Sequence, residues 1–301
     1  MGSDVRQAVA ALLDTDPTTA FAQLVAGGWT AVGLAEDLGG SGGDLRDAAD
    51  VAAACAASGH RLPVADLLFV TARVLTLAGI PLPAGAVCVV AAGDRVPWAS
   101  WATHFLSVID NRVDLIEHAV VEPGTNLAGE PRDTVHLTGP VLASSPVDNV
   151  VDEIRTAGAL ARAVQLAAAI ERVLAITVRY CAEREQFGRP IAAFQAVQQE
   201  LAALAGESTA ATAAVDHAIQ NPTRHTVAVA KIRTGMAAGT AARLAHQVHG
   251  AIGITREYPL HRHTTALWSW RDEYGGEREW SAVLAADVIG HDPAWHGLAP
   301  A

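Results

Sequence analysis

Apolar residues recur at helical spacing towards both ends of this chain, and a different pattern separates the two stretches. Between Val5 and about Gly79 the apolar positions lie three or four residues apart, which predicts several amphipathic helices. From about Leu82 to Pro140 short β-branched runs stand between Gly, Pro, Asn and Asp. They predict a small antiparallel region of about five strands, at 86–91, 105–110, 112–116, 118–122 and 134–138.

The helical spacing returns at about Val147. A first long helix is predicted to end just before Arg184, because one apolar stripe leads up to it: Ile170, Val173, Leu174, Thr177, Val178 and Cys181. A second helix is predicted to stop near Pro222, and an alanine-rich third helix to run from about Arg224 to His249. Alanine at this density lets neighbouring helices approach closely, so we expect a tightly packed helical bundle.

These patterns predict a mainly helical α+β fold in three domains: a helical domain at 1–81, a small β domain at 82–146 and a helical bundle at 147–301. A chain of 301 residues is long enough for such an arrangement. Hydrophobic residues make up 50% of it and charged residues 18%, with a mean hydropathy of +0.23. This is apolar for a soluble protein, so we expect a partner to cover part of the surface.

Charge and cysteine usage narrow the function classes. The net charge of -11 argues against a nucleic-acid-binding protein, because no basic stripe is available to neutralise a phosphate backbone. Cys55, Cys88 and Cys181 are far apart within apolar segments, as expected for buried free thiols in a reducing cytoplasm. No segment has the pattern of a signal peptide or a membrane helix, so we expect a cytoplasmic protein.

The loop between the first two long helices has a distinctive composition. It reads Arg184-Glu-Gln-Phe-Gly-Arg-Pro-Ile191 and leads into Phe194-Gln195 at the start of the second helix. The sequence therefore predicts a helical hairpin with a cation and amide groups at one corner, where phosphates and nucleotides can bind. The simpler alternative is that Arg184 only caps the C-terminus of its helix.

Four histidines raise the question of a metal site: His246, His249, His261 and His263. A His-x-x-His spacing can place two imidazoles on one side of a helix. No carboxylate or thiolate stands at ligand spacing from them, so we expect no metal.

Three segments, in order, resemble the acyl-CoA dehydrogenase family. They are the Arg-x-x-Phe-Gly-x-Pro-Ile loop at Arg184, the stretch Gln247-Val-His-Gly-Ala-Ile-Gly-Ile-Thr-Arg-Glu-Tyr-Pro259, and the glycine-rich turn from Gly28 to Gly43. The resemblance implies an N-terminal helical domain, a β domain and a C-terminal four-helix bundle, with FAD sites shared across a dimer. It also implies that the FAD tail of a partner chain is contacted by Arg184, Gln186, Phe187, Gln195, Gln247 and Gly250.

The chain departs from the family pattern where the catalytic base belongs. The dehydrogenation needs a carboxylate to remove the α-proton. The family's Tyr-Glu-Gly-Thr run corresponds here to Asp272-Glu-Tyr-Gly-Gly-Glu277, which places Gly275 by motif, or Tyr274 by ungapped counting, at the base position. Some members carry the Glu near the start of the first bundle helix instead, and that position is Gly158. Glu273 is a displaced candidate, although a surface glutamate is the simpler interpretation of it.

The β domain is also truncated, at about half the length that the resemblance leads us to expect, and the segments that hold the flavin ring and the thioester are not recognisable. We therefore expect a non-catalytic subunit of a heteromeric α2β2 enzyme, of the type found among actinobacterial enzymes that act on steroid side-chain CoA thioesters. A longer partner subunit would supply the base and bind most of the acyl-CoA, and an electron-transfer flavoprotein would accept the electrons. Two alternatives stay open: a self-sufficient FAD enzyme that uses Glu273 or another carboxylate, and a flavin-free scaffold on the same fold.

Overall fold

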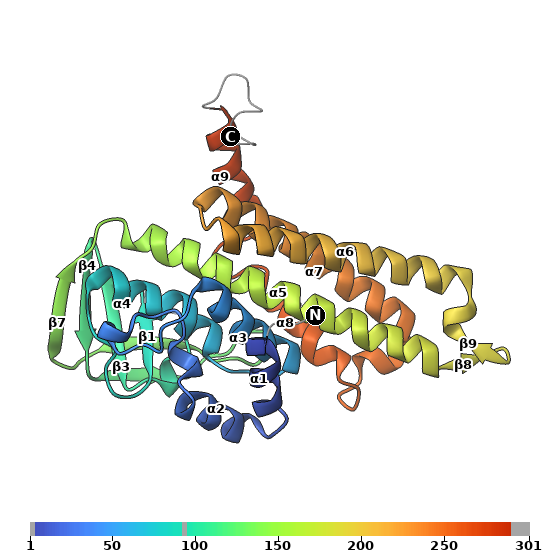
Figure 1. The fold of residues 1–301 in the computed structure, drawn as a ribbon, viewed down its shortest axis with the longest axis horizontal. Coiled ribbons are helices and arrows are strands. Elements are labelled where there is room, and N and C mark those ends of the chain that lie inside the picture. Colours follow the sequence, from blue (N-terminus) through green and yellow to red (C-terminus); the bar gives the residue numbers. More distant parts are fainter. Residues whose placement is uncertain (1–3, 92–94, 290–301) are drawn as a thin grey trace. The chain divides into compact units, whose positions relative to one another are not determined.

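The computed structural model describes residues 4–91 and 95–289 (Figure 1). The chain divides into two compact units, Met1–Ala161 and Arg162–Ala301. The domain bounds expected above stay a prediction, and their ends at 1–3 and 290–301 lie outside the described residues. Nowhere in the described ranges is there a helix with the length and apolar character needed to cross a membrane.

The first unit begins with helices whose ends are set by local side chains. Its α-helices are α1 (Asp4–Leu12), α2 (Pro17–Ala26), α3 (Leu45–Ser58) and α4 (Ala72–Ala78). The side chain of Asp16 accepts hydrogen bonds from the backbone N–H groups of Thr18 and Thr19, and Pro17 occupies the first turn of α2. Asp44 and Asp47 form a reciprocal capping box at the start of α3. Short polar residues before apolar runs therefore fix where these helices begin.

The strands of the first unit form two small sheets. One sheet has the order β1 (Val87–Val90), β3 (His104–Ile109), β4 (Arg112–Ile116) and β7 (Val141–Pro146). The other has the order β2 (Val96–Pro97), β6 (Arg132–Leu137) and β5 (Ala119–Glu122). All five predicted runs are strands, which confirms that part of the sequence analysis.

Two details of the predicted β region are wrong. Strand β1 pairs with β3 in parallel, so the region is not purely antiparallel; the connection between them passes through β2 and a 3-10 helix at Ala99–Trp101. Strands β2 and β7 were not predicted. The first has only two residues and contains Pro97, and the second has Ala143, Ser144 and Ser145 in its middle, so neither carries a β-branched run.

The long helices of the second unit form the bundle. The helix α5 (Val150–Glu183) contributes most of its length to this unit, followed by α6 (Gln195–Gln220), α7 (Arg224–His249), α8 (Leu260–Trp270) and α9 (Glu277–Ile289). The helices α6 and α7 run alongside each other (Figure 1). On α7 the residues Ala237, Ala238, Ala241 and Ala242 are fully buried, as expected where small side chains allow close helix packing. The mainly helical fold with small sheets and a C-terminal helical bundle is confirmed.

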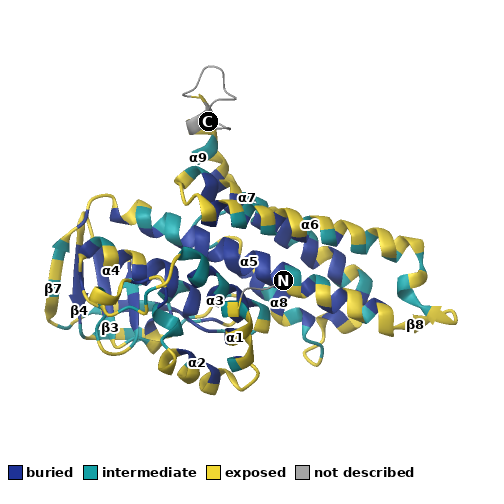
Figure 2. Ribbon diagram, viewed as in Figure 1, coloured by how far each residue is buried: buried dark blue, intermediate teal, exposed yellow. Residues whose placement is uncertain are grey.

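The bundle core follows the predicted stripe with one exception. From Ala163 to Ile170 every residue of α5 is buried (Figure 2), and Val173, Thr177 and Cys181 continue the buried face. Val178 is 46% exposed, so the predicted stripe is one position too wide. The cysteines are free thiols with buried side chains, as predicted.

Candidate cofactor-binding hairpin and base positions

The predicted corner is a tight β-hairpin after α5. Strands β8 (Glu185–Gln186) and β9 (Arg189–Pro190) pair, and the turn between them consists of Phe187 and Gly188. Both turn residues have positive φ, 50° and 79°, as a type I′ turn requires. The hairpin base is closed by the backbone N–H of Ile191, which donates to the carbonyl oxygen of Arg184 at 2.8 Å.

Phe187 projects from the hairpin tip with 90% of its surface exposed. Its ring makes an edge contact with Phe194, with 6.0 Å between ring centroids, and the guanidinium of Arg189 lies 4.3 Å above the Phe194 ring. A bulky side chain in the left-handed region is uncommon and strained. Because the ring is almost fully exposed, burial within the chain does not offset this backbone strain. The exposed ring is therefore suited to a contact with another molecule.

The polar residues predicted beside Phe187 are also accessible. Arg184, Gln186 and Gln195 are all exposed, and Gln195 is the first residue of α6. Within residues 4–91 and 95–289, no acidic side chain forms an ion pair with Arg184. A guanidinium fork matches a diphosphate, and amides and an aromatic edge suit an adenine nucleotide. The donor set of this hairpin therefore fits the tail of FAD.

The second predicted segment lies at the end of α7. Gln247 is exposed, and Gly250 follows the helix with φ 61° and ψ -143°, a conformation that favours glycine. A Cβ atom built on Gly250 would meet no atom of the chain within 4 Å. The glycine therefore leaves open space on its outer side, where another molecule can approach the backbone.

The structure brings these two segments together through an aromatic stack. The rings of Tyr180 on α5 and His249 on α7 lie 4.3 Å apart between centroids and 21° from parallel. The backbone N–H of Arg184 donates to the carbonyl oxygen of Tyr180 at 2.8 Å. Arg184 and Gly250 thus flank the two partners of one stack, although they are far apart in sequence.

Neither base position holds an acid. Gly275 has φ 97° and Tyr274 has φ 54°, and the carbonyl oxygen of Tyr274 accepts a hydrogen bond from Trp280 Nε1 at 3.0 Å. Gly158 is buried in α5. The glycine conformation at 275 is strained for any side chain with a Cβ atom.

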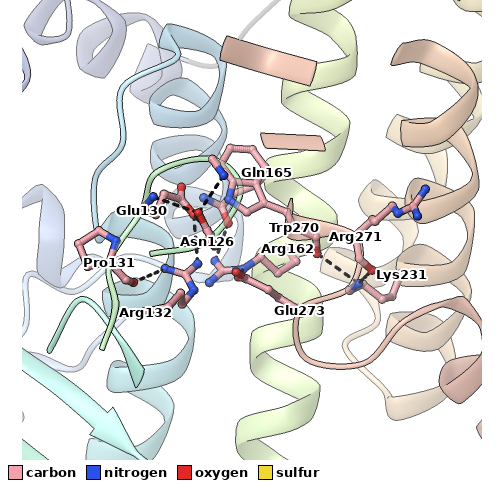
Figure 3. Close-up of polar contacts among 11 residues, drawn as sticks. Asn126, Glu130, Pro131, Arg132, Arg162, Gln165, Lys231, Trp270, Arg271 and Glu273 are labelled. Carbon is pink, nitrogen blue, oxygen red and sulfur yellow. Dashed lines mark hydrogen bonds and ion pairs between the residues drawn. The ribbon is translucent and has the colours of Figure 1, made fainter. Parts of the chain in front are cut away.

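Glu273 is not the surface glutamate that the sequence suggested. Its side chain is 14% exposed, and its Oε2 atom accepts a hydrogen bond from Arg162 Nε at 2.7 Å (Figure 3). Arg162 is 1% exposed, donates through Nη1 to Gln165 Oε1 at 2.6 Å, and lies 5.2 Å from the Tyr274 ring centroid. The carboxylate of Glu273 is therefore bound to a buried cation, close in sequence to the predicted base position at Gly275.

Lys231 is a second buried cation that sequence reasoning missed. Its Nζ atom donates to the carbonyl oxygen of Arg271 at 2.6 Å and so caps the C-terminal end of α8 (Figure 3). Burial, reinforced by the positive charge of Arg162, lowers the pKa of this amine to about 8. Two sequence signals could have indicated these buried cations. Arg162 is a single arginine within an apolar run, and Lys231 is the only lysine of the sequence.

Buried carboxylates of the first unit are also bound by neighbours. Glu130 Oε2 accepts from Arg132 Nη2 at 3.1 Å and from Asn126 Nδ2 at 2.8 Å (Figure 3). Asp133 accepts from the backbone N–H groups of Ser100 and Gly124. These acids stabilise loops around β6 and offer no base for proton abstraction.

The histidines do not assemble a metal site. His249 donates through Nδ1 to the carbonyl oxygen of Ala245, and His246 Nε2 lies 2.9 Å from Thr264 Oγ1. In the part of the chain that the structure describes, no group of three or more His, Cys, Asp or Glu residues could hold a metal ion.

Comparison with known proteins agrees with this geometry. The family model for the C-terminal domain of acyl-CoA dehydrogenase matches residues 150–279, which include both segments predicted to contact the cofactor and Gly275. The chain is 33% identical over 243 residues to the acyl-CoA dehydrogenase IpdE2 of Mycobacterium tuberculosis, covering 78% of this chain and 75% of that protein. It is 28% identical over 299 residues to IpdE2 of Mycolicibacterium smegmatis, covering 95% and 92%.

Solved structures show the same fold. A chain of the ChsE4–ChsE5 complex from Mycobacterium tuberculosis superposes with a TM-score of 0.81 at 19% identity, covering 97% of this chain and 99% of that chain. A chain of the steroid ACAD Tcur3481–Tcur3483 gives a TM-score of 0.73 at 22% identity, covering 96% and 94%. With the sequence match to IpdE2 over most of both chains and the family fold throughout, this chain belongs to the acyl-CoA dehydrogenase family.

Proposed function

We propose that this chain is a non-catalytic subunit of a heteromeric acyl-CoA dehydrogenase and completes the FAD site of a longer partner subunit. One combination of features carries the proposal. The chain keeps an exposed Arg184, Gln186 and Phe187 on a strained hairpin, while its own base positions hold Gly275 and Gly158. A dehydrogenase site needs both the residues that hold the FAD tail and a carboxylate base, so this chain alone would not complete one.

The chain's own residues would hold the tail of the cofactor. Arg184 would bind the diphosphate through its guanidinium, and Phe187 and Gln195 would contact the adenosine end. Gln247 and the exposed backbone at Gly250 would approach the same tail. FAD, when bound, supplies the acceptor for the substrate hydride.

The partner would supply what this chain lacks. It would carry the carboxylate base and the flavin-ring pocket and would bind most of the acyl-CoA, and an electron-transfer flavoprotein would accept the electrons. The similar structures named above are a complex of two named proteins, ChsE4–ChsE5, and a steroid ACAD named by two designations. They support an α2β2 assembly and a steroid side-chain CoA thioester as the substrate class.

The self-sufficient alternative has less support. A base at Glu273 would have to leave its bond to Arg162, which is almost completely buried and would lose its counter-charge. We therefore assign Glu273 a structural role.

Co-expression tests the proposal. The chain is purified alone and together with a longer acyl-CoA dehydrogenase chain that carries a Tyr-Glu-Gly run, and flavin absorbance and dye-linked dehydrogenation are measured. We expect colour and turnover only in the complex, reduced FAD retention in Arg184→Ala, and normal retention in Arg172→Ala, which changes an exposed arginine on α5. Purification of the chain alone as a yellow, active homo-oligomer would overturn the proposal.

A further inference from the structure

His249 stands out among the titratable residues of the bundle because it is buried within an aromatic cluster. It ends α7 with 4% of its surface exposed, stacks on Tyr180, and lies 5.1 Å from the Tyr258 ring centroid. Its Nδ1 atom lies 2.8 Å from the carbonyl oxygen of Ala245, which can only accept, so Nδ1 carries the proton. Its Nε2 atom is buried and has no hydrogen-bond partner among the described residues.

This imidazole is located between the two cofactor segments. Tyr180 Oη donates to the carbonyl oxygen of His249 at 3.4 Å, and Tyr180 lies one helical turn before Arg184. On the other side, Gly250 follows His249 directly and its backbone N–H donates to the carbonyl oxygen of His246. The Tyr180–His249 stack is therefore a physical link from the hairpin at the end of α5 to the turn at the end of α7.

We propose that His249 is a pH-sensitive positioning residue, whose neutral ring holds the Gln247–Gly250 turn against the end of α5 and whose protonation loosens this turn. The physical reason for this pH sensitivity is that His249 Nε2 is buried without a hydrogen-bond partner among the described residues. A proton on Nε2 would create a buried N–H group and a buried charge with no acceptor among the described residues. The effect on FAD rests on the proposed function, whereas the local loosening of the turn does not.

Aromatic rings and one further histidine surround His249. They are Tyr180 from α5, Tyr258 from the segment before α8, and His246 from α7 itself, of which His246 favours the neutral ring by its charge. The charge of Arg179 lowers the pKa of Tyr258 and that of Glu183 raises it, and the charge of His261 lowers the pKa of His246. No carboxylate contributes to the shift in the pKa of His249.

Burial lowers the pKa of His249; the hydrogen bond to Ala245 opposes this in part, and the nearby His246 adds to it. The folded pKa is thus below the unfolded value of 6.5. As the pH falls through 6.5, the unfolded or locally opened chain binds the proton first. The stability of the turn is complete above this value and is lost in the window just below it.

The experiment compares His249→Phe, which keeps an aromatic ring but cannot titrate, with His217→Gln, which changes an exposed histidine on α6. FAD release from the complex with the partner subunit is followed by flavin fluorescence. Between about pH 7.5 and about pH 5.5 we expect release to accelerate about tenfold in the wild type and in His217→Gln. We expect no such acceleration in His249→Phe, and an unchanged acceleration there would overturn the proposal.

A second measurement does not depend on FAD. Hydrogen exchange of residues 247–254 in the full chain is compared between wild type and His249→Phe at each pH, and the His249 ring is titrated by NMR in the wild type. We expect the wild type to lose protection relative to the variant only at the lower pH, and the His249 ring to titrate below the ordinary histidine value of 6.5. Equal protection in the two proteins, or a His249 ring that titrates at or above 6.5, would overturn this proposal. Failure of the complex to retain FAD would instead contradict the proposed function and would leave this measurement valid.

Discussion

Arg162 Nε donates to Glu273 Oε2 across 2.7 Å, and the arginine of this pair is 1% exposed. The two residues are 111 positions apart in sequence. Their contact fixes the end of α8 and the turn that follows it to the core helix α5. It also binds the carboxylate of Glu273, which lies two residues before Gly275, to a buried cation.

Replacement of Glu273 by Gln should destabilise the chain strongly. Removal of one partner leaves a buried guanidinium without its counter-charge, which costs about 3–5 kcal/mol. The matched control is Glu153→Gln, because the Arg73–Glu153 pair has a similar distance of 2.8 Å but side chains that are 45% and 38% exposed. We expect a cost of at most about 1 kcal/mol there.

Urea unfolding of the full chain measures both changes. Equal destabilisation by the two variants would contradict a structural role for the Arg162–Glu273 pair. Turnover of the complex provides an independent readout: a folded Glu273→Gln complex should keep its activity. A complete loss of turnover in such a complex would identify Glu273 as a base after all.

A glutamate placed at the former base position should not restore activity. In Gly275→Glu the new residue would have to adopt φ 97°, which strains a side chain with a Cβ atom, so the turn would shift and misplace the carboxylate. We expect the variant chain alone to show no acyl-CoA dehydrogenation, measured with a dye acceptor. Gly276→Glu is the control, because a Cβ atom there meets only Asp272 Oδ1 at 3.8 Å. Turnover by Gly275→Glu but not by the control would show that only the base is missing.

Local sequence signals predicted the helices, five strands and the loop after Arg184 because each depends on neighbouring residues, but they did not predict that this loop pairs as the β-hairpin of β8 and β9. The end of α5 follows from the Phe187-Gly188 turn, and the start of α7 from Thr223, whose side chain accepts from the backbone N–H of Thr226. Spacing alone could not pair Arg162 with Glu273. A charge in an apolar run signals a buried partner, but the fold decides which partner it is.

The same limit applies to the candidate site. Motifs indicated Arg184, Phe187 and Gln247, yet they could not show that Phe187 would be strained and almost fully exposed. They also gave no sign that His249 would stack on Tyr180, because ring stacking depends on how the ends of two long helices meet. The sequence therefore predicts which side chains the hairpin carries better than it predicts the backbone conformation and ring packing that position them.

The exposed ring at the hairpin tip should be dispensable for folding but required for the cofactor. In Phe187→Asn the turn becomes Asn-Gly, the preferred type I′ pair, so the hairpin should gain about 0.5–1 kcal/mol. Amide hydrogen exchange at Ile191, whose N–H closes the hairpin, measures this gain. FAD retention in the complex should fall, since the aromatic contact is lost.

Gly188→Ala is the opposite change in the same turn. Its φ of 79° disfavours alanine, and a Cβ atom would meet nothing within 4 Å, so we expect a purely conformational loss of about 1 kcal/mol. Phe187 stays in place, and FAD retention should suffer less than in Phe187→Asn. If retention followed hairpin stability in both variants, the ring itself would have no role in binding.

The buried amine of Lys231 should make stability rise with pH. Its folded pKa of about 8 lies below the unfolded value of 10.5, so between these values the unfolded chain binds more protons than the folded chain. The cost of the buried charge is complete below pH 8 and disappears towards pH 10.5, a gain of about 3 kcal/mol.

Lys231→Met isolates this effect, because Lys231 is the only lysine in the sequence and the substitution removes its amine alone. The free energy of unfolding is measured in urea at steps from pH 7.5 to about pH 10.5. We expect the wild type to gain stability relative to Lys231→Met across this window. A difference between the two proteins that stays constant with pH would mean that the amine keeps its ordinary pKa in the fold. The bond from Nζ to the carbonyl oxygen of Arg271 would then compensate the charge fully.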